Sequence, residues 1–204
     1  MSHYYITDKT LGSNKKKLTY TYFGINVELF SDLGIFSKER IDFGTNVLLN
    51  NLAIQANAKS ILDLGCGYGI IGICLGKKFP DKSITMVDVN ERCIELTNEN
   101  IKKNSLKNAT CYLSNLYDNI KGKFDVIVSN PPIRAGKEVV FSVIKKGYEH
   151  LNNDGEIWVV IQKKQGAPSL EKLMEEVFGN VLVAAKEKGY YILTSKKICE
   201  FNWE

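Results

Sequence analysis

The chain has 204 residues, 44% of them hydrophobic and 25% charged, and a formal net charge of +4. This length and hydrophobic content suit one α/β domain with a modest extension and argue against a disordered chain. No apolar run approaches the roughly 20 residues of a membrane helix, and no signal pattern opens the chain. The five cysteines are scattered, without the spacing of metal ligands. We therefore expect a cytoplasmic protein with reduced thiols and no metal site.

The order of the predicted elements indicates a mostly parallel sheet. A short β-hairpin around Gly24 comes first, and we assign residues 1–42 to an N-terminal extension and 43–204 to the main domain. Strands then alternate with helical runs, which indicates right-handed crossovers. Only residues 187–189 separate the last two strands, so these must form an antiparallel hairpin. The predicted strands are 18–23, 26–30, 60–64, 83–87, 110–113, 124–129, 156–161, 181–186 and 190–196, and the predicted helices are 44–56, 69–78, 91–104, 137–151 and 169–178.

A glycine loop follows the first strand of the main domain. Asp63 lies in that strand, and Gly65-Cys66-Gly67-Tyr68-Gly69 leads into an apolar run that suits a helix. A dinucleotide fingerprint starting at Gly65 would need its third glycine where the chain has Ile70. The loop N–H groups and the start of the helix attract an anion such as a carboxylate, and Asp63 would attract an ammonium while repelling phosphates. A carboxylate and an ammonium together describe the methionine end of S-adenosylmethionine.

Two further strand ends carry polar side chains that suit the rest of that cofactor. Asp88 lies about 20 residues past the glycine loop, where an acid accepts hydrogen bonds from a ribose diol. Asn115 follows the next strand, and its amide could accept from an adenine amine and donate to a ring nitrogen. Either residue alone could equally be a helix N-cap. Because both follow the glycine loop at successive strand ends, we favour a methyl-donor site.

Asn130-Pro131-Pro132 stands where the buried strand 124–129 ends. Two prolines cannot continue a strand ladder, since they lack N–H groups and fix φ at about −65°. The chain must therefore leave the sheet with the Asn130 amide and the Pro131 carbonyl at the carboxyl end of the strand, where ligands of open α/β sheets bind. Two fixed acceptors suit a planar amine with two N–H bonds. An isolated Asn-Pro-Pro is more often a turn, but the glycine loop upstream favours an amine-binding site.

Basic side chains follow two neighbouring strands of the predicted sheet. Arg134 and Lys137 come after Asn-Pro-Pro, and Lys163 and Lys164 come after the next strand. Parallel neighbours end at the same edge, so these cations would surround the predicted active site and could bind phosphates. Solvated surface charges are the alternative, and a pI of about 8.7 is too low to decide between the two.

Three segments carry a resemblance to a known family. DLGCGYG at 63–69, VDVN at 87–90 and SNPPIRAGK at 129–137 resemble the class I S-adenosylmethionine-dependent methyltransferases. Within these, the match is to the small-subunit ribosomal RNA guanine-N2 methyltransferase family. Residues 32–49 resemble that family's segment before the glycine loop, and QKKQGAP at 162–168 resembles its single-domain bacterial branch.

The resemblance covers nearly the whole chain, from about residue 4 to residue 197. It implies a Rossmann-like α/β fold with helices on both faces of a seven-stranded sheet, in the order 3-2-1-4-5-7-6 with the last strand antiparallel. It also implies S-adenosyl-L-methionine as cofactor and methyl transfer to an exocyclic amine of a nucleobase. The expected target is guanine N2 of small-subunit ribosomal RNA, met as naked RNA or in a small-subunit particle.

These expectations assign roles to three groups of residues. The expected catalytic residues are Asn130, Pro131 and Pro132. The residues expected at the cofactor are Phe36, Asp63, Gly65, Cys66, Gly67, Gly69, Asp88, Val89, Asn115, Leu116 and Asn130. The residues expected at the substrate are Ile133, Arg134, Lys137, Lys163 and Lys164.

One position departs from the family pattern. The family places an aromatic residue after the second proline to stack on the base, and this chain has Ile133 there. Phe36, in a loop expected to close over the site, is a candidate replacement. Adenine-N6 methylation of nucleic acid and methylation of a protein glutamine amide remain open, because both acceptors present a planar NH₂ group. A non-catalytic RNA-binding module is a further alternative, but it would have no need of Asp63, Asp88 and Asn130 together.

Overall fold

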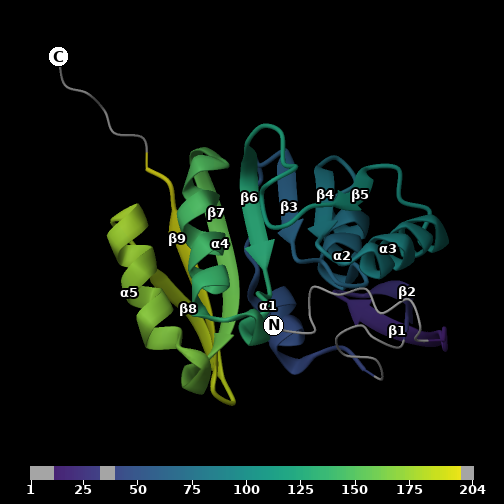
Figure 1. Cartoon of the computed structure of the whole chain (residues 1–204). Coiled ribbons are helices and arrows are strands. Elements are labelled where there is room, and N and C mark those ends of the chain that lie inside the picture. The colour runs from purple at the N-terminus through teal and green to yellow at the C-terminus, as the bar shows by residue number, and fades with distance from the viewer. Residues whose placement is uncertain (1–11, 33–39, 199–204) are drawn as a thin grey trace.

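The computed structural model describes residues 12–32 and 40–198, so Phe36 lies outside the described residues. It contains a seven-stranded sheet in the order β5-β4-β3-β6-β7-β9-β8, and a separate two-stranded sheet formed by β1 and β2 (Figure 1). The strands are β1 (Lys16–Tyr22), β2 (Ile25–Ser31), β3 (Ser60–Leu64), β4 (Ser83–Asp88), β5 (Ala109–Leu113), β6 (Phe124–Ser129), β7 (Leu151–Gln162), β8 (Leu182–Glu187) and β9 (Tyr190–Lys196). The helices are α1 (Phe43–Asn51), α2 (Ile70–Lys78), α3 (Glu91–Lys103), α4 (Lys137–Glu149) and α5 (Ala167–Phe178).

The strand order confirms the predicted topology. β5, β4, β3, β6 and β7 pair in parallel, whereas β9 is antiparallel to both of its neighbours, β7 and β8. The chain adds β4 and β5 on one side of β3 and returns to add β6 on the other side. The switch point of the sheet therefore lies between β3 and β6, where open α/β sheets bind ligands at the carboxyl ends of the strands.

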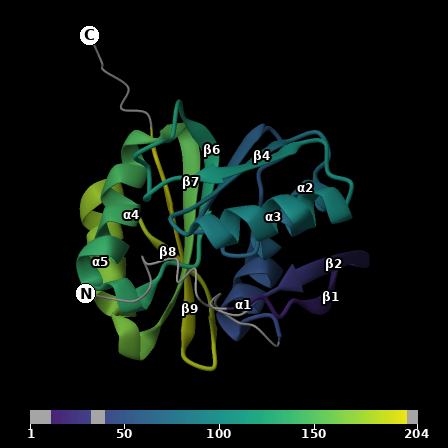
Figure 2. The same ribbon diagram turned by 45° about the vertical axis from the view of Figure 1, so that its right-hand side comes forward.

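Helices cover both faces of the sheet because alternate residues of each central strand face opposite sides. In β6, Val126 and Val128 belong to the core cluster that contains residues of α1, α2 and α3, whereas Ile127 belongs to the cluster that contains residues of α4 and α5. Figures 1 and 2 show α4 and α5 together at one end of the molecule, and α2, α3 and the hairpin at the other.

Most elements differ from the prediction by one or two residues at an end, and two differ by five. The helix expected at 44–56 ends at Asn51, where Leu52 turns to an extended conformation and the Asn51 amide donates to the Val47 carbonyl at 2.8 Å. The strand expected at 156–161 begins at Leu151, which pairs with Phe124, and a register shift then joins this start to the regular pairing of β6 with β7. Neither difference moves the end of a strand that carries a predicted site residue.

The hairpin β1–β2 is tied to α3 by two asparagines one helical turn apart. Asn100 accepts from the Phe30 N–H at 2.7 Å and donates to the Phe30 carbonyl at 2.9 Å. Asn104 makes the same pair of bonds to the backbone of Glu28, at 3.3 and 2.7 Å. The two side chains thus bind backbone N–H and C=O groups at the edge of β2, which would otherwise be free to pair with another strand. Within the two described segments, no helix is long and apolar enough to cross a membrane.

Candidate active site

The glycine loop has a left-handed backbone conformation and free space beside two of its glycines. Gly65, Gly67 and Gly69 have φ of 75°, 59° and 87°, a backbone region that favours glycine. A Cβ added at Gly65 or Gly67 would meet no atom within 4 Å. Thr97 holds the loop from behind, since its Oγ1 donates to the Gly67 carbonyl at 2.9 Å. The loop therefore has both the conformation and the free space that a ligand in backbone contact requires.

Asp63 is a buried carboxylate, and one of its two oxygens lacks a hydrogen-bond partner. The side chain is fully buried, and its Oδ2 accepts from the Gly72 N–H at 2.9 Å. Among the described residues, Oδ1 is the one buried side-chain polar atom without a hydrogen-bond partner. Burial raises the pKa of Asp63 to about 7, and the nearby Asp88 carboxylate adds to this, while the Gly72 N–H opposes it. An ammonium group would supply the missing partner, which fits the amine of S-adenosylmethionine.

Asp88 joins the end of β4 to the glycine loop. Its Oδ2 accepts from the Gly67 N–H and its Oδ1 from the Asn90 N–H, each at 2.9 Å. Burial raises the pKa of Asp88, although the backbone N–H groups of Asn90, Gly67 and Val89 counteract part of this effect. Each carboxylate oxygen retains a second lone pair, so both can still accept from a diol.

The ends of β3, β4, β5 and β6 share one cavity. Asn115 and Leu116 line it from the end of β5, where Asn115 donates to Asp118 at 3.1 Å and keeps its own oxygen as an acceptor. The thiol of Cys66 is buried near Thr97 and Cys111, so Cys66 would meet a ligand through its backbone. The cavity brings together residues predicted from four separate strand ends, namely Gly65, Asp88, Val89, Asn115, Leu116 and Pro132.

Asn130 has a fixed amide orientation. Its Nδ2 donates to Asp42 Oδ2 at 3.1 Å and to Thr45 Oγ1 at 2.9 Å. A carboxylate only accepts hydrogen bonds, so the NH₂ group must face Asp42 and the carbonyl oxygen must face away. No described residue donates to Asn130 Oδ1. The end of β6 therefore presents an oriented acceptor, and its contact with a substrate amine stays a prediction.

Asp42 and Thr45 were not identified from the sequence as site residues. Asp42 is the N-cap of α1, where its Oδ2 also accepts the Thr45 N–H at 2.9 Å. An acid just before a helix is a recognisable N-cap, but a cap does not indicate a contact with Asn130, 88 residues further along the chain. Only the packing of α1 against β7, β8 and β9 brings its first turn to this edge.

The predicted cations gather at the same edge of the sheet. Arg134 lies in the short 3₁₀ turn η2 (Ile133–Ala135), Lys137 begins α4, and Lys163 and Lys164 lie in a second turn, η3 (Lys163–Gln165). All four are exposed, and none forms an ion pair with another described residue. Their contact with a substrate stays a prediction.

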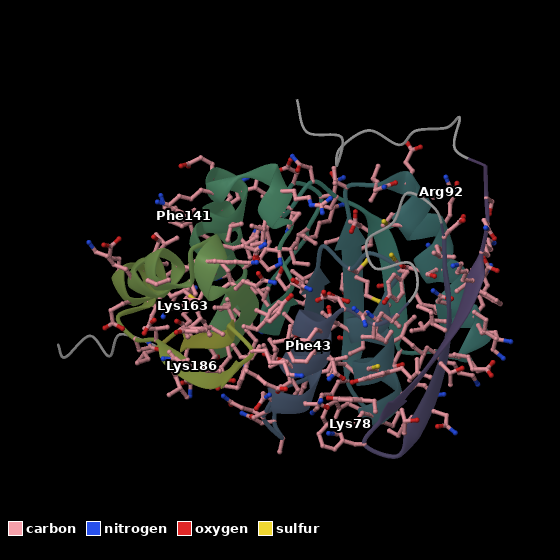
Figure 3. All side chains as sticks on the ribbon, turned by 90° about the horizontal axis from the view of Figure 1, so that it is seen from below. Phe43, Lys78, Arg92, Phe141, Lys163 and Lys186 are labelled. Carbon is pink, nitrogen blue, oxygen red and sulfur yellow. The ribbon has the colours of Figure 1, made fainter. Side chains whose placement is uncertain are left out.

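The turn between β8 and β9 adds cations that the sequence did not identify. Lys163 donates its N–H to the Gly189 carbonyl at 2.8 Å, which joins η3 to this turn. Lys186 and Lys188 lie on either side of the end of β8, and both are exposed. Figure 3 looks onto this edge, with Phe43 near the centre, Lys163 and Lys186 on one side and Arg92 of α3 on the other.

Ile133, which stands in place of the family's aromatic residue, packs toward α4 and α5. It belongs to the margin of the core cluster formed by these helices, and it lines a cavity with Phe141, Ile161 and Leu170. The side chain is only partly buried. Its expected contact with the substrate stays a prediction.

Comparisons with known proteins place the chain in one family. Residues 26–194 match the family model of the methyltransferase small domain. An uncharacterized protein of Bacillus subtilis, YbxB, is 45% identical over 198 residues, which cover 96% of this chain and 98% of that protein. Ribosomal RNA small subunit methyltransferase C of Haemophilus influenzae is 31% identical over 175 residues, which cover 84% of this chain. The chain spans about half the length of that relative, 52%.

A solved structure agrees with the fold. The Thermus thermophilus 16S rRNA N2 G1207 methyltransferase, in complex with AdoMet and guanosine, matches with a TM-score of 0.80 at 23% identity, over 92% of this chain and 52% of that one. This likeness concerns the fold, whereas the family model and the sequence relatives carry the assignment. The predictions of the fold, the enzyme class and the cofactor are confirmed, and the chain belongs to the methyltransferase small domain family as an S-adenosylmethionine-dependent methyltransferase.

Proposed function

We propose that this protein methylates an exocyclic amino group of a nucleobase in RNA, with guanine N2 of small-subunit ribosomal RNA as the target. The observation that carries the proposal is the fixed amide of Asn130, whose oxygen is free at the end of β6. A planar amine has two N–H bonds, and the Pro131 carbonyl would accept the second one. The sequence relatives named as ribosomal RNA methyltransferases support RNA as the substrate.

The proposed mechanism uses position and electrostatics. The lone pair of an exocyclic amine is delocalised into the ring, so the amine is a poor nucleophile. Acceptors at Asn130 and Pro131 would hold both N–H bonds, direct the lone pair toward the donor and stabilise the positive charge that develops on nitrogen. S-adenosylmethionine, when bound, supplies an electrophilic methyl group on its sulfonium. The new N–C bond would replace the S–C bond, and a proton of the methylated nitrogen would pass to solvent.

Asp42 and Thr45 act on the reaction through Asn130. Without them the amide could rotate and present its NH₂ group to the substrate amine, which would be repulsive. Their two hydrogen bonds, at 3.1 and 2.9 Å, remove that alternative before the substrate arrives. This preorganisation avoids a reorganisation cost in the transition state.

The test identifies the methylated nucleoside. Naked small-subunit ribosomal RNA and small-subunit particles, both from cells that lack this protein, would be incubated with S-adenosylmethionine carrying a labelled methyl group. We expect labelled N2-methylguanosine after digestion to nucleosides and mass spectrometry, and far less of it in the same time with Asn130→Ala. Label in N6-methyladenosine, or only in a protein glutamine, would contradict the proposed target.

A further inference from the structure

Phe43 is an aromatic side chain at the carboxyl edge of the sheet, next to Asp42, which orients Asn130. It is the first residue of α1 and is only partly buried. Its ring packs against Tyr190, with the centroids 5.5 Å apart and the planes tilted by 56°. Lys188 Nζ lies 4.9 Å from the ring centroid. The ring is therefore backed by a second aromatic, and an exposed lysine side chain lies over it.

The order of the strands places Phe43 on the side of Asn130 that faces away from the predicted cofactor residues. Asp63, Asp88 and Asn115 lie in or after β3, β4 and β5, on one side of β6 in the sheet. Tyr190 starts β9 and pairs with Gln162 at the end of β7, on the other side of β6. In a direct methyl transfer the nucleophile approaches opposite the leaving sulfur. The rest of the acceptor molecule must then extend from Asn130 away from β3, toward the ends of β7 and β9.

We propose that Phe43 stacks on the ring of the acceptor nucleobase, with Tyr190 supporting it from behind. This rests on the proposed function. A base that reaches an enclosed site must leave its stack, and aromatic side chains replace the stacking it had there. Lys188, which has no ion-pair partner among the described residues, moves from the Phe43 ring to a backbone phosphate when the base enters.

Two other lysines also lie over aromatic rings. Lys186 Nζ lies 4.6 Å from the Tyr191 ring centroid, and Lys137 Nζ lies 4.8 Å from that of Phe141. Lys186 and Lys137 flank the ends of β8 and β6 on the same edge. Alternating cations and aromatic faces suit a single strand, since the phosphates meet the lysines and the bases meet the rings.

The first experiment measures methyl transfer by Phe43→Leu, which keeps an apolar side chain beside Tyr190 but removes the ring. We expect kcat/KM for the RNA substrate to fall at least about tenfold, with an unchanged Kd for S-adenosylmethionine. Phe43→Trp should retain most of the activity, because its ring still stacks. Phe23→Leu is the matched control, since Phe23 is 62% exposed beneath Lys78 at 3.5 Å, at the far end of α2 from the glycine loop, and it should behave as wild type.

The second experiment measures stacking directly and does not depend on turnover. The indole fluorescence that Phe43→Trp adds to the wild-type signal should be quenched by guanosine monophosphate in the presence of S-adenosylhomocysteine. The native tryptophans, Trp158 and Trp203, are present in both proteins, so subtraction of the wild-type signal removes them.

The results separate the two proposals. If the wild type methylates RNA but Phe43→Leu is equally active, or if the added fluorescence of Phe43→Trp does not respond to the nucleotide, Phe43 does not stack on the base. If the wild type methylates no RNA, the proposed function itself fails, whatever the variants do. A loss of activity in Phe43→Leu that Phe43→Trp does not restore would indicate a packing role and would also contradict the inference.

Discussion

The two halves of the candidate site differ in charge, burial and construction. The donor half, at the ends of β3, β4 and β5, is acidic and buried, and backbone groups form much of it. Asp63 and Asp88 both accept from backbone N–H groups there. The acceptor half, from β6 to the β8–β9 turn, is exposed and basic, and side chains form most of it.

The proposed function accounts for this difference, because its two substrates differ in size and charge. S-adenosylmethionine is small and cationic at its amine and sulfonium, so a rigid site with buried carboxylates can match it group by group. An RNA substrate is a large polyanion, and it needs a broad surface of mobile cations around one fixed point of chemistry. Asn130 is that point, and it is the acceptor-side group whose orientation is fixed in advance.

The largest expected effect is a slower methyl-transfer step with unchanged binding of both substrates. Asn130→Ala should lower kcat by about 10²–10³, because it removes a preorganised acceptor that acts in the transition state. The Kd for S-adenosylmethionine and for RNA should change little, as measured by calorimetry and filter binding. Asn50→Ala, which replaces an exposed asparagine of the helix that Asp42 caps, is the control. A variant that retained more than a third of wild-type turnover would exclude this role for Asn130.

A change confined to the donor half should come next in size. Asp88→Ala removes acceptors for the ribose diol, and charge-assisted hydrogen bonds contribute roughly 1.5–3 kcal/mol, so donor affinity should fall at least tenfold. RNA binding should be unchanged. Asp81→Ala, which replaces a 74% exposed acid before the same strand, should leave the calorimetric Kd as in the wild type. Equal donor affinities in the two variants would remove Asp88 from the cofactor site.

Charge-removing substitutions in the acceptor half should weaken RNA binding and leave donor binding unchanged. Neutralising Lys163 and Lys164 together should weaken RNA binding at every sequence tested and reduce the slope of log K against log salt by about 0.7–0.9 for each phosphate that is no longer neutralised. Donor affinity should not change. Lys121→Ala with Lys123→Ala is the matched pair, because these exposed lysines precede β6 and lie at the other edge of the sheet. An unaltered salt slope would make Lys163 and Lys164 ordinary surface charges.

The smallest expected effect is a pH dependence confined to the donor half. The pKa of Asp63 is raised from 3.8 to about 7, so the carboxyl is partly protonated near neutral pH. Binding of an ammonium favours the ionised form, so donor affinity should rise several-fold between about pH 6 and 7.5, with release of a proton. Calorimetry in buffers of different ionisation enthalpy measures both. Asp63→Asn should abolish the proton release, and a wild-type affinity that fell with rising pH would contradict the assignment.

The donor half was the more predictable from the sequence because its parts are local. A strand, a glycine loop and a helix lie within one short segment, and Asp88 follows at a characteristic spacing. The strand order was predictable for a similar reason, since alternating strands and helices permit few right-handed arrangements and the family resemblance selected one. Helix α1 was predicted too long because apolar residues continue past Asn51, although the chain turns to an extended conformation at Leu52.

The acceptor half depends on contacts between residues far apart in the chain. Asn130 and its four basic neighbours could be placed at the correct edge because they follow adjacent parallel strands. The partners of Asn130 could not, since Asp42 lies 88 residues away on a helix whose packing decides the contact. Phe43 and Lys188 meet only because the β8–β9 hairpin returns to the edge where α1 begins.

The double role of Asp42 has a consequence for heat inactivation. One carboxylate oxygen both caps α1 and holds the Asn130 amide. Fraying of the first helical turn would therefore release the amide without unfolding the sheet, and such local openings cost less free energy than global unfolding. The protein would lose turnover below its melting temperature while still binding its cofactor, so its working range is set by one helix end rather than by its core.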